Sequence, residues 1–262
     1  MSPARGDLAG RGVLVTRPAG QAGPLARRIT EAGGRPVLFP SLEIVPPSDP
    51  AAFERALARL PTCQHAVFVS PTCVALAWPA IHARHGGWPT GVAAAAVGHA
   101  TARALAEVGV TGVRVSAEGA DSEHLLALPE FTQVAGEQVI IFRGEGGREL
   151  IADTLRQRGA EVTYAECYRR VCPEVDASPL RAEWRAGGIA AVTVTSREIF
   201  AHLVRLLGPE GADLLRATPL FAPHPRIVDA ARAWGVAHAV TTAPGDAGLV
   251  AGLRDWFNPG HD

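Results

Sequence analysis

Hydroxyl groups, arginines and glycines recur where the predicted strands end, and such groups suit the binding of anions. Serine, threonine and arginine side chains donate hydrogen bonds to carboxylates and phosphates, and unpaired backbone N–H groups at a helix start do the same. The candidate binding residues at these turns are Thr16, Arg17, Ser70, Thr72, Gly98, His99, Ala100, Thr101, Arg143, Gly144, Glu145, Ser196, Arg197, His224 and Arg226. This set predicts a ligand with several carboxylates or phosphates.

Tyr168 is the residue best suited to acid chemistry. It is one of only two tyrosines, and it lies in a segment, 164–172, that reads as an extended linker between domains. A phenol in a cleft between domains can donate a proton or a hydrogen bond to a departing oxygen. The alternative is that the Tyr168 ring packs on a domain surface.

Several of the binding candidates have a purely structural alternative. Ser70 and Ser196 can cap the helices that follow them, and His99 and His224 can be surface histidines near helix starts. No Ser-His-Asp set and no pair of carboxylates can be assembled from the sequence. The glycines of 144–147 do not complete a dinucleotide-binding fingerprint, so no nicotinamide cofactor is expected.

The composition excludes several classes of reaction. All 25 basic residues are arginine, which excludes a Schiff-base lysine and a Walker-type phosphate loop. The cysteines lack the spacing of a zinc site, so reduced thiols and no bound metal are predicted. They are Cys63, Cys73, Cys167 and Cys172.

The charge and the apolar runs bear on partners and location. A net charge of −1 gives no general attraction to nucleic acid or to an anionic membrane. The first residues show no signal-peptide pattern, and no apolar run reaches the roughly 20 residues that a membrane span needs. We therefore expect a cytoplasmic protein.

The elements that must hold these candidates repeat one unit. Residues 138–173 read as a strand, a glycine-bearing turn, a helix and a second strand, and residues 12–47 repeat this pattern at a displacement of 126 positions. The register extends further, since Ser70 falls on Ser196. Such an ungapped register predicts an internal duplication.

Strands alternate with helices along the whole chain, which predicts an α/β protein with two doubly wound parallel sheets. Asp49 is expected to cap one helix and Ser122 another, and a strand is expected over 111–116. Two extended linkers leave two topologies open. Either each half is a domain, or the chain starts one domain, crosses to build the second and returns; side-by-side linkers would then leave a cleft.

At this point the chain resembles a known family, uroporphyrinogen-III synthase, over about residues 12 to 255. The most specific segments read LVTRPAGQ from Leu14 and RGEGGRELIADTLRQRGAEVTYAECYRR from Arg143. The resemblance implies the crossing topology, with two flavodoxin-like domains. Their expected bounds are 1–39 with 173–262 for the first domain, 47–163 for the second, and 40–46 and 164–172 for the linkers.

The resemblance also implies a reaction, that of a cyclising hydro-lyase. The family converts the linear tetrapyrrole hydroxymethylbilane to uroporphyrinogen III, inverting the last pyrrole ring, with no metal or organic cofactor. Tyr168 matches a family tyrosine proposed as the acid, and the binding candidates would hold the substrate carboxylates. Two family turns differ here. His224, Pro225, Arg226 and Ile227 stand where many members have Gly-Pro-Thr-Thr, so two hydroxyls are absent, and Arg197 follows Ser196 in place of a proline.

Two other functions remain open at this stage. A two-domain ligand sensor of the periplasmic-binding type, without catalysis, also has duplicated α/β halves. A two-domain glycosyltransferase is a third possibility, although the chain is short for one. For the synthase we expect a monomer whose partners are its substrate and, transiently, the preceding enzyme of the pathway.

Overall fold

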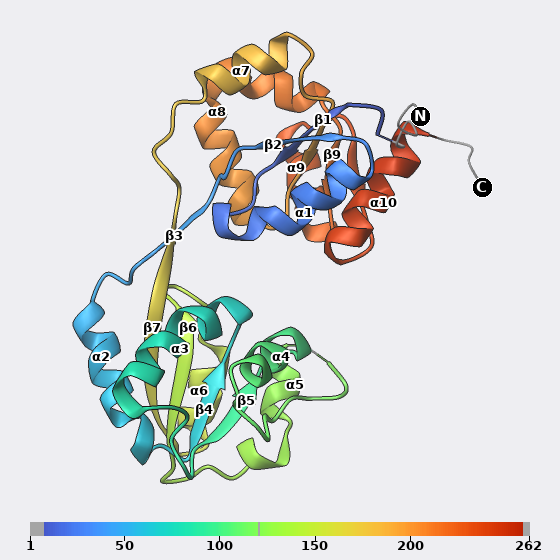
Figure 1. The fold of residues 1–262 in the computed structure, drawn as a ribbon. Helices are drawn as coiled ribbons and strands as arrows, with labels where there is room; N and C mark the ends of the chain where they lie inside the picture. The colour runs from blue at the N-terminus through green and yellow to red at the C-terminus, as the bar shows by residue number, and fades with distance from the viewer. Residues whose placement is uncertain (1–7, 120, 259–262) are drawn as a thin grey trace. The chain divides into compact units, whose positions relative to one another are not determined.

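The computed structural model describes residues 8–119 and 121–258, which form two compact units (Figure 1). The terminal unit takes the chain up to Glu43 and again from Val171 onward, and the central unit is Ile44–Arg170. Each unit contains one five-stranded sheet. The α/β prediction with two doubly wound sheets is therefore confirmed.

In the terminal unit the strand order is β10-β9-β8-β1-β2, and the neighbouring strands run parallel. The strands are β1 (Gly12–Val15), β2 (Arg35–Leu38), β8 (Ala191–Thr193), β9 (Leu220–Ala222) and β10 (Ala239–Thr241). The helices are α1 (Ala19–Glu31), α7 (Ser178–Arg185), α8 (Arg197–Ala217), α9 (Pro225–Trp234) and α10 (Gly245–Phe257). Gly208, followed by Pro209, interrupts α8 because its backbone is not helical.

In the central unit the strand order is β3-β7-β6-β4-β5. The strands are β3 (Glu43–Val45), β4 (His65–Phe68), β5 (Ala93–Ala96), β6 (Gln138–Gly144) and β7 (Glu161–Val171). The helices are α2 (Pro50–Arg59), α3 (Pro71–His85), α4 (His99–Glu107), α5 (Ser122–Leu126) and α6 (Leu150–Gln157), with short 3-10 turns at Leu60–Thr62 and Pro129–Phe131. Most of the segment expected to be the second linker lies within β7.

Strand pairing confirms the internal duplication. Val13 of β1 pairs with Ala191 of β8. The residue 126 positions after Val13 is Val139 of β6, and the residue 126 positions before Ala191 is His65 of β4. These two residues also pair. The same shift relates the pairing of β1 with β2 to that of β6 with β7. Each sheet therefore contains strands from both copies of the repeat.

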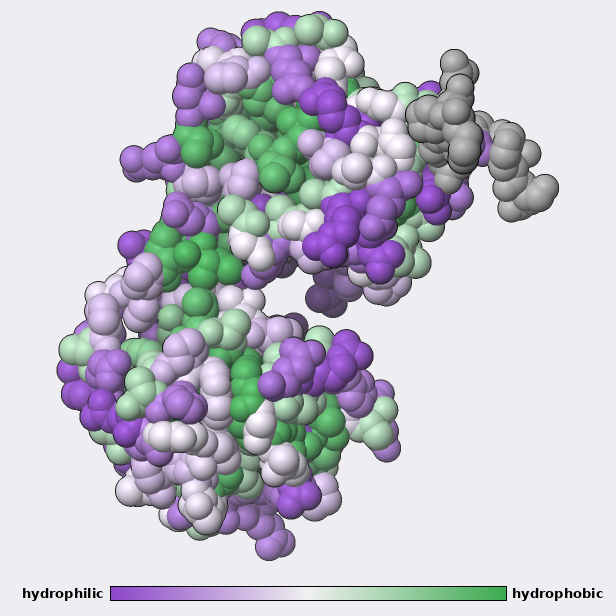
Figure 2. All heavy atoms as spheres, viewed as in Figure 1, coloured by the Kyte–Doolittle hydropathy of each residue, from purple (hydrophilic) through white to green (hydrophobic). Residues whose placement is uncertain are grey.

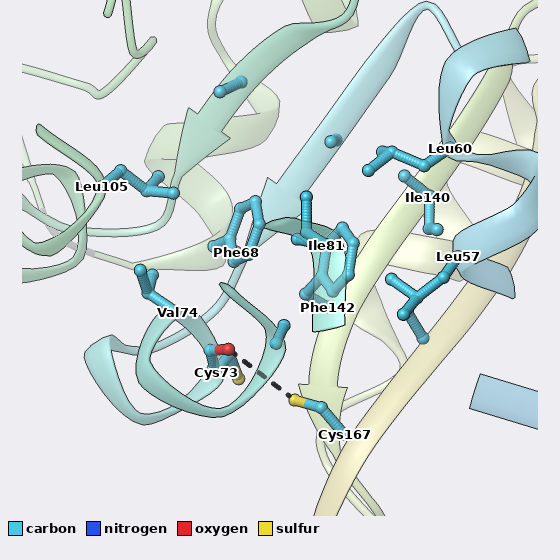
Figure 3. Packing of buried hydrophobic residues seen from close by; sticks show 14 of the residues in the cluster. Leu57, Leu60, Phe68, Cys73, Val74, Ile81, Leu105, Ile140, Phe142 and Cys167 are labelled. Atoms are coloured by element: carbon cyan, nitrogen blue, oxygen red, sulfur yellow. Dashed lines mark hydrogen bonds between the residues drawn. The ribbon is translucent and has the colours of Figure 1, made fainter. Parts of the chain in front are cut away.

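Both faces of the central sheet are buried. Phe68 and Phe142 stack on the face covered by α2, α3 and α4, with ring centroids 4.3 Å apart (Figure 3). Val139 and Ile141 point to the other face, into a cluster with α5 and α6. Burying each such side chain contributes about 2 kcal/mol, so the strands that carry the candidate site are firmly held.

The helix starts and one strand test the local predictions. Asp49 caps α2 by accepting a hydrogen bond from the Ala52 N–H at 2.9 Å, as predicted. The predicted cap Ser122 is wrong, because the carboxylate of Asp121 reaches the His124 N–H and starts α5 one residue earlier. The strand expected over 111–116 is also wrong, because the segment forms only one bridge to β5, at Arg114.

The surface is mixed in polarity. On the face drawn in Figure 2, hydrophilic residues are spread over both units, with hydrophobic residues between them. Among residues 8–119 and 121–258, no helix combines the length and the apolar character that a membrane crossing requires.

Candidate active site

The central unit has a cavity of about 320 Å³ beside the carboxyl ends of β4 and β6. Four predicted site residues line it: Ser70, Arg143, Gly144 and Tyr168. Its other lining residues were not predicted from the sequence; they are Val69, Val97, Ser122, Ile141, Gly147, Arg148, Ile151, Ala152, Tyr164 and Arg170. Cavities of this size at this edge of a parallel sheet commonly bind small molecules.

Ser70 starts helix α3 at the edge of this cavity. Its Oγ accepts a hydrogen bond from the Cys73 N–H at 3.2 Å, so the structural role as an N-cap is present. The same hydroxyl also interacts with the side chain of Tyr168. Ser70 therefore both begins the helix and contacts the candidate acid.

Tyr168 lies on β7 and is only 5% exposed. Burial is the main cause that raises the pKa of its phenol, and the neighbouring Cys73 thiol raises it further, while Ser70 acts in the opposite direction. The phenol therefore keeps its proton at neutral pH. An acid catalyst needs that protonation state.

Cys73 of α3 and Cys167 of β7 lie close together (Figure 3), and both interact with Tyr168. The Cys167 thiol also lies 3.3 Å from the Arg143 carbonyl oxygen. A hydrogen bond from Cys167 is the main cause that lowers the pKa of Cys73 to about 7, and the same contact raises the pKa of Cys167. Cys73 is therefore the thiol that ionises first, and both cysteines are free thiols in this structure.

Arg143 is almost fully buried, with 3% of its surface exposed. One terminal nitrogen donates to Glu149 Oε1 at 2.9 Å, and Nε donates to the Gly144 carbonyl at 3.2 Å. The guanidinium carbon lies 4.6 Å from the centre of the Tyr164 ring, a cation–π contact. The charge of Arg143 is thus already matched inside the protein.

Glu149 holds this arrangement together. Its second oxygen accepts a hydrogen bond from the Tyr164 hydroxyl. That bond is the largest cause that lowers the pKa of Glu149, and the bond from Arg143 also contributes. Burial, followed by the contact with Glu149, raises the pKa of Tyr164. Glu149 is therefore the ionised partner and Tyr164 the neutral donor.

Two further arginines line the cavity and were not among the predicted residues. The side chain of Arg148 is 66% exposed and lies 3.7 Å from Glu123, and Arg170 follows Tyr168 by two residues on β7. Their sequence signal was weak, because exposed arginines occur on many surfaces. Beside the cavity they provide the positive charge that an anionic ligand requires.

The remaining predicted residues of the central unit have other surroundings. Glu145 accepts hydrogen bonds from the backbone and the hydroxyl of Ser48. Thr101 is buried at the start of α4. Within the described part of the chain, the cavity lining does not include Thr72, Gly98, His99, Ala100, Thr101 or Glu145.

In the terminal unit, two predicted residues have partners of their own. Thr16 is fully buried, and its hydroxyl donates to the Thr193 carbonyl at 2.7 Å, which ties β1 to β8. Arg17 forms an ion pair of 2.5 Å with Asp246 in the first turn of α10. Both side chains thus contribute to the structure of this unit.

Four other predicted residues lie at two helix starts of the terminal unit. Ser196 caps α8 by accepting from the Ile199 N–H at 3.1 Å, and His224 caps α9 through Nδ1. Arg197 and Arg226 follow these caps and are exposed. Because β8 and β9 are neighbours, the two starts lie at the same edge of the sheet. Helix starts with arginines attract anionic groups.

Comparison with known proteins gives a consistent result. The family model of "Uroporphyrinogen-III synthase HemD" matches residues 23–251. A uroporphyrinogen-III synthase of Escherichia coli (strain K12) is 36% identical over 195 residues, which are 74% of this chain and 79% of that protein. Another, from Salmonella typhimurium, is 34% identical over 73% of this chain and 78% of its own length.

A solved structure is similar in fold. A mutant uroporphyrinogen III synthase from the extremely thermophilic bacterium Thermus thermophilus matches with a TM-score of 0.59 over 93% of this chain and 97% of that chain. The identity in this match is 18%, so it bears on the fold alone.

Proposed function

The chain belongs to the uroporphyrinogen-III synthase family, and from that membership we propose that Tyr168 supplies the proton for the first step of the family reaction. The enzyme is a hydro-lyase that converts hydroxymethylbilane to uroporphyrinogen III in tetrapyrrole biosynthesis. Both the ligand-sensor and the glycosyltransferase alternatives are set aside on this ground.

In the first step the terminal hydroxyl of the substrate departs. Tyr168 donates its proton to that hydroxyl, which leaves as water, and the substrate becomes a reactive azafulvene. Attack through the substituted carbon of the last pyrrole gives a spiro intermediate, which fragments and recloses with that ring inverted. The ring carbon then releases a proton, and the Tyr168 phenolate takes it back.

The observation that carries this proposal is a phenol that is 5% exposed and whose pKa is raised by burial, in the wall of a cavity. The phenol is therefore in its acid form at neutral pH, as proton donation to the departing oxygen requires. Burial also strengthens the interaction of the phenol with charge that develops on the departing oxygen.

The substrate is a polyacid, so its carboxylates need donors. In the central unit we propose that Arg148 and Arg170 bind carboxylates at the cavity, and that Arg143 fixes the shape of its wall. In the terminal unit we propose the starts of α8 and α9, with Ser196, Arg197 and Arg226, as carboxylate-binding groups. Holding the flexible chain in one conformation is the larger part of the task, because closure must occur at the hindered carbon.

Three expectations from the sequence stay predictions. They are a cytoplasmic location, a monomeric state, and transient contact with the preceding enzyme of the pathway.

Replacing Tyr168 by phenylalanine tests the acid role. We expect Tyr168→Phe to lower kcat about 100-fold while KM stays within about threefold, because only the proton donor is removed. The measurement uses enzymatically generated hydroxymethylbilane and separates the type I and type III isomers.

The matched control is Leu42→Met, a conservative change at the buried position 126 residues earlier, for which we expect a rate within about twofold of the wild type. An unchanged rate in Tyr168→Phe would remove the acid role. No excess of type III isomer over a protein-free sample would contradict synthase activity itself.

A further inference from the structure

A β-bulge in β7 determines which way Tyr168 points. β6 and β7 pair residue by residue up to Arg143 and Glu166, and then Gly144 pairs with Tyr168, so that Cys167 is an extra residue in β7. Bulges of this kind change the direction of the side chains that follow them and are frequent beside active sites.

The burial of the β7 side chains follows this change of direction. Ala165 and Cys167 face the core cluster that includes α3, whereas Val162 and Tyr164 pack against the cluster on the opposite face. By simple alternation Tyr168 would share the face of Tyr164. It belongs instead to the α3 cluster, because the bulge shifts the alternation by one residue.

Gly144 leaves the space that the ring of Tyr168 then fills. A Cβ atom at position 144 would lie 2.6 Å from both Cε2 and Cζ of Tyr168 and 3.0 Å from its hydroxyl oxygen. Real Cβ atoms do not approach that closely, so the phenol lies directly against the backbone of β6. The backbone angle at Gly144 is not in the region that requires glycine, so the ring is what an added methyl group would displace.

We propose that Gly144 and the bulge at Cys167 are positioning elements for Tyr168, which hold its phenol against β6 with the hydroxyl beside Ser70 and the cavity. Glycine is needed at 144 for the close approach of the ring. The consequence for the rate rests on the proposed acid role of Tyr168, but the placement of the ring does not.

Absorbance titration tests the placement without catalysis. The chain has two tyrosines, so in a Tyr164→Phe background the tyrosinate signal reports Tyr168 alone. Adding Gly144→Ala should lower the apparent pKa of Tyr168 toward its ordinary value, because the displaced ring gains contact with water. The control is Gly23→Ala in α1, where an added Cβ meets nothing within 4 Å; it should leave the titration unchanged. An unchanged titration in Gly144→Ala would overturn the proposal.

Kinetics separates this proposal from the acid role. We expect Gly144→Ala to lower kcat at least about tenfold with KM within about threefold, since small displacements of a catalytic group are costly. Combined with Tyr168→Phe it should cause almost no further loss, whereas additive losses would contradict positioning. If Tyr168→Phe alone keeps the full rate, the acid role fails while the titration still decides the placement.

A double variant keeps the proposal testable if Gly144→Ala folds poorly. The double variant Gly144→Ala/Tyr168→Ala removes the clashing ring, so we expect it to be at least as resistant to heat as Tyr168→Ala alone. If Gly144→Ala lowers the resistance to heat as much in the Tyr168→Ala background as it does in the wild type, position 144 acts through something other than the ring.

Discussion

The two copies of the repeat share their strand register but differ at the strand ends. Where the central unit has Gly144 and Tyr168, the positions 126 residues earlier in the terminal unit are Pro18 and Leu42. Leu42 is buried, with 4% exposed, and has no group that can transfer a proton. The strand pairing is thus the same in both copies, whereas the proposed acid is present in one copy.

The arginines at the first strand ends show the same contrast. Arg143 and Arg17 are equivalent in the repeat, but Arg143 is 3% exposed between Glu149 and the Tyr164 ring, whereas Arg17 pairs with Asp246 nearer the surface. An equivalent residue has become a part of the cavity wall in one unit and an ion pair in the other. Position in the repeat therefore does not fix the role of a side chain.

The largest difference in stability should come from this pair of arginines. We expect Arg143→Met to lower the free energy of unfolding by about 2 kcal/mol, because it removes the charge-assisted hydrogen bond that a buried guanidinium donates to Glu149. Arg17→Met should cost about 1 kcal/mol or less, as partly exposed ion pairs do. Denaturant unfolding of both variants measures the difference. Equal losses of free energy would show that the two equivalent arginines contribute equally to stability, contrary to this expectation.

A smaller difference should separate the equivalent serines. Ser70→Ala and Ser196→Ala each remove an N-cap, so each should cost about 1 kcal/mol of stability. Only Ser70 contacts Tyr168, so only Ser70→Ala should change the acid, and we expect its kcat to fall about tenfold more than that of Ser196→Ala. Ser196→Ala, which removes a proposed carboxylate-binding group, should act mainly on KM. Steady-state rates at saturating substrate test this. Matching kcat values in the two variants would mean that the contact with Tyr168 has no kinetic role.

The smallest effect should be a change in alkaline stability. Burial raises the folded pKa of Tyr168 above its ordinary value near 10. Above pH 10 the native state therefore keeps a proton that the unfolded state loses, and the free energy of unfolding falls as pH rises through the folded pKa. Tyr168→Phe should make that decline shallower, as followed by denaturant unfolding between pH 8 and 11. Leu42→Met, with no titrating group, should keep the slope of the wild type.

The fold could be predicted well because hydrophobic periodicity and internal repetition can both be read directly from the sequence. The 126-residue register in the sequence corresponds to the pairing of Val13 with Ala191 and of His65 with Val139. The errors arose where the structure of a segment depends on a single adjacent residue or a single backbone contact. Asp121, not Ser122, is the N-cap of α5, and the segment around Arg114 forms a single bridge instead of a strand.

The site was less predictable because it depends on contacts between distant segments. Nothing in the sequence places Cys73 next to Cys167, since their meeting requires α3 and β7 to share one face of the sheet. The bulge that turns Tyr168 toward that face is likewise visible only in the strand pairing. Residue types at strand ends identified Ser70, Arg143, Gly144 and Tyr168 as candidates. They did not show which of these groups already form hydrogen bonds or ion pairs within the protein.

The interleaved path of the chain has a consequence for its synthesis. The continuous unit, Ile44–Arg170, has all its strands once that stretch has emerged from the ribosome, whereas β1 must wait for β8, about 180 residues further along, before the pairing of Val13 with Ala191 can form. At translation rates of roughly 5 to 20 residues per second, this wait lasts on the order of ten seconds or more. Throughout that interval β1 has β2 beside it but lacks its second neighbouring strand, so the nascent N-terminal segment is where a chaperone would have most to protect.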